Sequence, residues 1–252
     1  MQVTFQMLLI VCPLVFLASA IDAIGGGGGL ISLPAYLLTG LPPAVASGSN
    51  KFSASLGTLI ATFRYFKSGK LNVKPALCAV LGALPGAYLG AELLKRCDPK
   101  IVQIMLIIMI PIMAAILLLK KNTDIQPKPI NNARLVGCFA LGLACGFYDG
   151  FFGPGTGTLL IMGLTYLIGM DMVTASGSAK LINLASNCSA LTSLIVGKKV
   201  LFALSIPAAA FSIAGGYLGS WLAIRKGAKF VRQIMLVVMA LLIIKLIFQW
   251  FG

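Results

Sequence analysis

The stretches that decide how this chain folds read ASGSNK at residues 46–51 and ASGSAK at residues 175–180. They lie 129 residues apart in a chain of 252 residues. Other sequences keep the same spacing, since YLG at 88–90 recurs at 217–219. Matches that stay in register over roughly 95 residues predict two copies of one unit.

Around these motifs the sequence is strongly apolar. Hydrophobic residues make up 59% of the chain and charged residues only 10%, against about 25% charged residues in a typical soluble domain. Residues 101–119 carry no charge, and about 20 apolar residues cross a bilayer as a helix. The runs do not alternate polar and apolar residues, as barrel strands would. The sequence therefore predicts an all-α polytopic membrane protein.

The net charge of +14 does not indicate nucleic-acid binding. Most of the Lys and Arg residues lie in short clusters between apolar runs, where they would face lipid headgroups and set the orientation. We expect the lipid bilayer as the chain's environment and no nucleic acid as a partner.

The layout predicts two repeats of about four transmembrane helices, each with one short broken or re-entrant segment, and 8–10 membrane segments in total. The repeats would cover residues 1–121 and 133–252, with a polar linker at 122–132. The short segments, 30–41 and 158–168, are bounded by glycine, proline or polar residues. Paired short segments of this kind point to a transporter's binding site.

The orientation of the repeats depends on these short segments. If they are re-entrant, the repeats are parallel and the clustered loop charges divide 10 against 7. If they complete a crossing, the repeats are inverted and the same charges divide 12 against 5. The larger asymmetry favours inverted repeats with the N-terminus outside.

The first apolar run ends in Ala18-Ser19-Ala20, which resembles a signal-peptide cleavage site. No Lys or Arg precedes the run, and the sequence that follows it is repeated in the second half. We therefore expect a retained first helix.

Lys51 and Lys180 are the first candidates for function, because each ends a duplicated small polar motif inside a membrane segment. A charge at the bilayer centre costs roughly 2.5–3.5 kcal/mol and usually faces a cavity or a partner. Two such lysines would attract an anion. The alternative is that both snorkel to the interface.

The glycine loops at 25–29 and 153–157 are the second candidates. Each opens onto a short apolar helix, whose first N–H groups and partial positive charge suit an oxyanion. The alternative is close helix packing through small residues. Asp22 and Asp149 flank the loops, and three roles remain open for them: proton coupling, pairing with a buried lysine, or capping the next turn. The predicted substrate-binding residues are Lys51, Lys180, Ser47, Ser49, Asn50, Ser176, Ser178, Gly26, Gly27, Gly28, Gly155, Thr156, Gly157 and Asn183.

The six cysteines show no metal-ligand or redox spacing, and the chain contains no histidine. We therefore predict no metal and no cofactor. An enzyme is disfavoured because no nucleophile–base pair is recognisable.

The glycine loop after the first helix, the ASGSNK-type run and the duplicated half together resemble the sulfite exporter TauE/SafE family of membrane permeases, over about residues 8 to 248. The resemblance implies secondary transport of a small anion, such as sulfite, sulfoacetate or another organosulfonate, in a prokaryotic inner membrane, with proton coupling as an option. Residue 50 departs from the repeat, because Asn50 corresponds to Ala179. An uncoupled anion channel and a non-transporting assembly factor remain alternatives, and a homo-oligomer is compatible with either.

Overall fold

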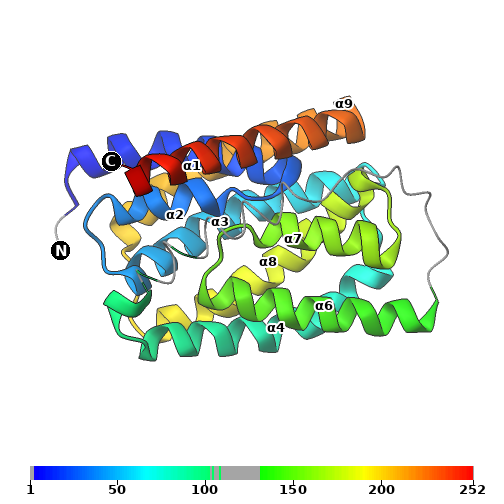
Figure 1. The fold of residues 1–252 in the computed structure, drawn as a ribbon, viewed down its shortest axis with the longest axis horizontal. Coiled ribbons are helices and arrows are strands. Elements are labelled where there is room, and N and C mark those ends of the chain that lie inside the picture. Colours follow the sequence, from blue (N-terminus) through cyan, green and yellow to red (C-terminus); the bar gives the residue numbers. More distant parts are fainter. Residues whose placement is uncertain (1–2, 103, 105–107, 109–130, 252) are drawn as a thin grey trace.

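The computed structural model describes residues 3–102, 104, 108 and 131–251; beyond residue 227, side chains are described only at 230 and 233. Every regular element in this part of the chain is helical (Figure 1), which confirms the predicted fold class. The first half contains α1 (Phe5–Gly25), α2 (Gly29–Leu37), α3 (Pro43–Lys67) and α4 (Val73–Arg96). The second contains α6 (Asn132–Phe151), α7 (Thr156–Gly163) with the π-helical turn η1 (Leu164–Ile168), α8 (Met172–Val196) and α9 (Phe202–Phe251). Most of the predicted segment 101–119 and of the linker 122–132 lies outside the described residues.

Five of the described helices are long and apolar enough to cross a membrane: α1, α4, α6, α8 and the part of α9 from Phe202 to Gly227. Their outward faces carry exposed leucines such as Leu9, Leu81 and Leu89, as lipid-facing surfaces do. Helix α3 has 25 residues and is as long as α8, but its buried face is rich in Ser and Thr. One face of α3 lies inside the molecule and carries polar groups that line its centre, while Leu59, Phe63 and Phe66 are exposed on the other face.

The short helices begin and end where the backbone requires it. Helix α2 has nine residues, about 14 Å, and is followed by Pro42 and Pro43. Helix α7 starts after Gly155, whose φ of 87° is left-handed. Its π-helical continuation ends at Gly169, with a φ of 84°. Both short segments predicted from the sequence are therefore present as short helices.

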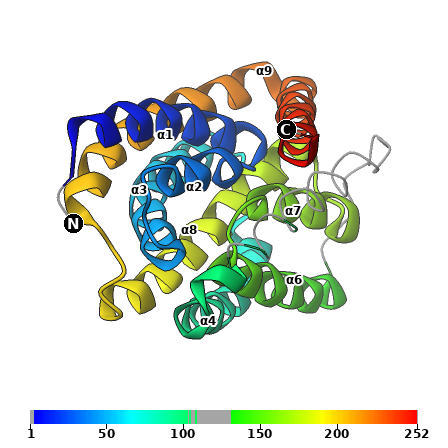
Figure 2. The same ribbon diagram turned by 60° about the vertical axis from the view of Figure 1, so that its left-hand side comes forward.

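The packing interlocks the two halves (Figure 2). Helix α1 packs against α9 and α4 against α6, while α3 and α8 lie between these pairs and contact each other. Small residues allow the close approach. At the seam between α4 and α6, a Cβ at Gly82, Gly86 or Gly90 would lie 2.2–2.4 Å from a carbonyl oxygen of α6.

Equivalent contacts recur at the two ends of the molecule. Ser49 Oγ accepts a hydrogen bond from the Leu201 N–H at 2.9 Å, and Ser178 Oγ accepts one from the Asn72 N–H at 3.0 Å. The two serines are 129 residues apart in the sequence, and so are the two backbone donors, Asn72 and Leu201. Helices α3 and α8 run in opposite directions (Figure 1). This is the relation that inverted repeats would have, while the duplication itself remains a prediction from the sequence.

Candidate functional site

Two lysines lie deep inside the molecule on the central helices. Lys51 is the ninth residue of α3 and Lys180 is the ninth residue of α8. Lys51 is 3% exposed and Lys180 is fully buried. Neither side chain therefore snorkels to the surface of the protein. A buried ammonium requires an opposite charge or several hydrogen-bond acceptors.

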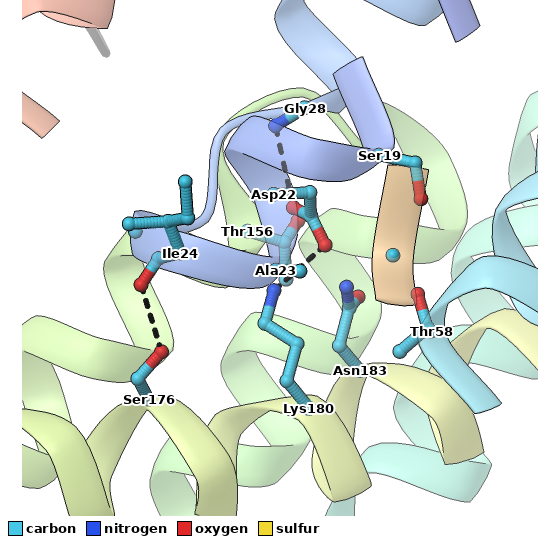
Figure 3. A network of polar contacts seen from close by, with 12 residues as sticks. Ser19, Asp22, Ala23, Ile24, Gly28, Thr58, Thr156, Ser176, Lys180 and Asn183 are labelled. Carbon is cyan, nitrogen blue, oxygen red and sulfur yellow. Dashed lines mark hydrogen bonds and ion pairs between the residues drawn. The ribbon is translucent and has the colours of Figure 1, made fainter. Parts of the chain in front are cut away.

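Each lysine finds that charge in the other half of the chain. Lys51 Nζ lies 2.9 Å from Asp149 Oδ2 on α6. Lys180 Nζ lies 2.7 Å from Asp22 Oδ2 on α1 (Figure 3). Asp22 also accepts a 3.2 Å hydrogen bond from the Gly28 N–H. Pairing with a buried lysine is thus realised for both aspartates, and Asp22 holds the glycine loop as well. With all four groups ionised, their charges sum to zero.

Helices of both halves enclose a cavity of about 50 Å³ between the two ion pairs. Ten polar or charged side chains lie along its wall besides the amides of Asn183 and Asn187: Ser19, Asp22, Ser32, Asn50, Lys51, Ser53, Thr58, Asp149, Thr156 and Ser212. Five glycines also line it and expose their backbone to the cavity: Gly28, Gly29, Gly153, Gly155 and Gly157. We call this space the central cavity. Because one water molecule needs roughly 10–15 Å³ of such volume, the cavity has room for about three to five water molecules.

The two glycine loops meet beside the central cavity. Gly26 has a φ of 76°, and a Cβ there would lie 2.3 Å from the backbone nitrogen of Thr158. A Cβ at Gly157 would lie 3.0 Å from Gly26 Cα and 3.5 Å from Lys180 Nζ. The loops are therefore in backbone contact, and the first turns of α2 and α7 both reach the cavity wall. The glycines therefore serve both predicted purposes: Gly26 allows the two loops to pack closely, and Gly28, Gly155 and Gly157 line the polar cavity.

The structure brings nine of the predicted residues to the cavity wall: Asp22, Gly28, Asn50, Lys51, Asp149, Gly155, Thr156, Gly157 and Asn183. Lys180 reaches this wall through its ion pair with Asp22. Six other predicted residues do not line the cavity: Ser47, Ser49, Ser176, Ser178, Gly26 and Gly27. We therefore leave these six out of the proposed substrate contacts.

Ser176 illustrates what one of those hydroxyls does instead. The last carbonyls of a helix have no partner within it. At the end of α1, three successive carbonyls accept hydrogen bonds from other elements: Ala23 from the Tyr65 hydroxyl, Ile24 from Ser176 and Gly25 from Thr158. Figure 3 shows the Ser176 contact. This hydroxyl thus fixes the end of the helix that carries Asp22.

Several cavity residues escaped the sequence prediction, among them Ser53, Thr58 and Ser212. Ser53 and Thr58 follow Asn50 at three and eight positions along α3, which is one helical face. Extending the polar stripe from Asn50 would have found both. Asn50 Oδ1 and Ser212 Oγ are buried without a hydrogen-bond partner among the described residues. Buried polar atoms are normally satisfied, so the cavity retains polar capacity for a bound molecule.

Comparison with known proteins agrees with this architecture. The family model described as "Sulfite exporter TauE/SafE" matches residues 11–246. A probable membrane transporter protein of Haemophilus influenzae is 31% identical over 253 residues, covering 100% of this chain and 99% of that protein. The probable membrane transporter protein YfcA of Escherichia coli K12 is 30% identical over 257 residues, covering 99% and 96%. No solved structure matches the chain.

These relatives and the five apolar helices make the chain a multi-pass membrane protein, and its bacterial relatives are consistent with the inner membrane. The match over nearly the whole length, together with the glycine loops and the duplicated lysine motifs, identifies the chain as a member of the sulfite exporter TauE/SafE family of membrane transporters.

Proposed function

We propose that this chain is a secondary transporter of a small anion of the sulfur oxyanion or organosulfonate class, such as sulfite or sulfoacetate, and that the anion binds in the central cavity. The observation that carries the proposal is the meeting of two short-helix N-termini and two lysines around one buried polar space. The family name supplies the sulfur-anion class, and the geometry supports an anion.

The cavity offers an anion both charge and hydrogen-bond donors. A helix N-terminus carries about half a positive charge and several N–H groups without a partner in the helix. Helices α2 and α7 each begin there, at Gly29 and Thr156. Serine, threonine and asparagine side chains add neutral donors. A site at the junction of two broken segments is the arrangement that secondary transporters use for small charged substrates.

The charge balance explains how such a site can release its substrate. If Lys51 and Lys180 were unpaired, two full positive charges in a buried space would hold an anion tightly. Asp149 and Asp22 neutralise them, so an anion that pairs with a lysine competes with the carboxylate that already holds it. Transport requires affinity that is sufficient for entry and weak enough for exit, and the competing carboxylates provide that limit.

Ligand binding should appear as thermal stabilisation of the detergent-solubilised protein. In gluconate buffer, we expect one or more of sulfite, thiosulfate, sulfoacetate and taurine to stabilise the folded state. The increase is about 2.7 kcal/mol at a hundredfold excess over the dissociation constant. Thr58→Val removes a cavity hydroxyl and should weaken this effect, whereas Thr192→Val, on the exposed side of α8, should preserve it. Absence of stabilisation by every anion would contradict the substrate assignment.

A further inference from the structure

We propose that the two lysine–aspartate pairs have different tasks. Asp22 exchanges a proton with the central cavity as the anion binds and leaves, while Asp149 stays ionised as the fixed partner of Lys51. This inference rests on the proposed function, because it concerns how the same site is coupled.

Asp149 is held on several sides. Its Oδ2 accepts hydrogen bonds from Lys51 Nζ at 2.9 Å and from Ser186 Oγ at 2.7 Å. Lys51 Nζ is anchored a second time by Asn187 Oδ1, at 3.0 Å. Both side chains of this pair are only 4% exposed. The carboxylate is therefore held by two donors on one oxygen, and the burial leaves little access for water.

Asp22 is held less firmly and faces the cavity. Its side chain is 18% exposed, against none for Lys180. Besides the lysine, its one described donor is the Gly28 N–H, at 3.2 Å, a long hydrogen bond. Lys180 Nζ has no other hydrogen-bond partner among the described residues. Figure 3 shows the lysine reaching Asp22, with Asn183 beside it.

The packing of α3 explains why the two sites differ. At the spacing of 129 residues, Gly57 and Thr58 correspond to Ser186 and Asn187. A Cβ at Gly57 would lie 2.3 Å from Ser212 Oγ and 2.6 Å from its carbonyl oxygen. No serine fits at this contact between α3 and α9, so Asp22 lacks the hydroxyl that Asp149 has. Thr58 is also shorter than Asn187 and makes no described bond to Lys180.

The other ionisable groups around Asp22 do not replace its lysine. From α3, Lys51 is engaged by Asp149, and the Tyr65 hydroxyl donates to the Ala23 carbonyl. On α9, Arg225 and Lys226 lie over the rings of Trp221 and Phe230. Helix α7 carries no ionisable side chain, and Tyr36 of α2 donates to Ser53. Asp149 on α6 faces the same cavity and is paired.

The proton balance follows from these contacts. A proton from the aqueous phase binds a carboxylate oxygen of Asp22 and makes it neutral. Lys180 then keeps its charge without a partner, and the cavity gains one net positive charge. A monovalent anion restores neutrality by pairing with Lys180. Departure of the anion favours reformation of the ion pair and release of the proton. The expected stoichiometry is one proton bound at Asp22 per anion bound.

The test measures proton uptake when sulfoacetate, or thiosulfate if sulfoacetate does not stabilise the protein, binds to the purified protein, because both anions are fully ionised near neutral pH. Calorimetry in buffers of different ionisation enthalpy should give about one proton per anion for the natural sequence. Affinity should rise up to tenfold per unit fall in pH. Asp22→Asn should bind without proton uptake and independently of pH, whereas Asp149→Asn, or Ser186→Ala if that variant does not fold, should retain the uptake. Loss of uptake in Asp149→Asn with retention in Asp22→Asn would overturn the proposal, as would no uptake in the natural sequence.

A second measurement uses the natural sequence and needs no folded variant. Dicyclohexylcarbodiimide modifies protonated carboxyl groups in membrane proteins, and mass spectrometry locates the label. Asp22 should be labelled severalfold more than Asp149, and more strongly at lower pH. Preferential labelling of Asp149 would contradict the assignment. If no anion binds but Asp22 is labelled, the substrate is wrong while the difference between the pairs stands.

Discussion

Lys51→Gln is expected to lower the free energy of unfolding by about 3–5 kcal/mol and to abolish transport, because it leaves Asp149 charged and unpaired in the interior. The size of the effect follows from burial: both side chains of the pair are nearly inaccessible. Unfolding in detergent and flux in vesicles would measure the two consequences separately. Lys67→Gln is the matched control, since Lys67 is exposed at the end of the same helix, and it should change stability by less than about 0.5 kcal/mol.

The double variant Lys51→Gln with Asp149→Asn separates charge pairing from function. Replacing both partners removes the unpaired charge, and neutral replacements of buried ion pairs are often tolerated. We expect stability to recover by at least half while transport stays absent, because the cavity wall has lost the positively charged end of Lys51. Full transport in the stable double variant would show that this pair serves folding alone.

Gly26→Ala is expected to produce the second large effect, a loss of several kcal/mol together with loss of transport. The residue has a φ of 76°, and the new Cβ would meet the Thr158 nitrogen at 2.3 Å. The two glycine loops would therefore have to separate at the point where α2 and α7 approach the cavity. Gly40→Ala supplies the control, because Gly40 also has a φ of 76° but nothing within 4 Å of the added Cβ.

The comparison of these two alanine variants measures how much the tight loop at Gly26 contributes to stability and flux. Gly26 also has a ψ of −176°, a backbone conformation essentially confined to glycine, so Gly26→Ala combines backbone strain with the steric contact, whereas the Cβ of Gly40→Ala meets nothing within 4 Å. Thermal unfolding should place Gly26→Ala clearly below Gly40→Ala, and only the latter should retain flux. Equal stability and equal flux in the two variants would show that the contact between the loops does not matter.

The two lysines could be predicted from the repeated motifs, because a charge within an apolar membrane segment is costly and usually faces a cavity or a partner. Their partners could not be derived, since the sequence places Lys51 and Asp149 98 residues apart and only the interlocked packing joins them. The aspartates had three open roles, and two of them, pairing and loop capping, occur together at Asp22.

The serines of the two motifs do not share the location of the lysines that follow them. Ser49 and Ser178 precede their lysines by two positions, and two residues on a helix differ by about 200° in direction. Their side chains therefore point away from the cavity and bind the backbone of Leu201 and Asn72. Periodicity on one face was the better guide, as it would have connected Asn50 to Thr58.

Flux in proteoliposomes tests the central claim most directly. Vesicles containing the purified protein should accumulate or release radiolabelled sulfite or sulfoacetate faster than protein-free vesicles, and a pH gradient should change the rate. Vesicles with Lys51→Gln plus Asp149→Asn, compared at equal reconstituted protein, should match the protein-free rate. If the natural sequence moves none of the tested anions while remaining folded in the vesicles, the account of this cavity as the path of a small anion is wrong.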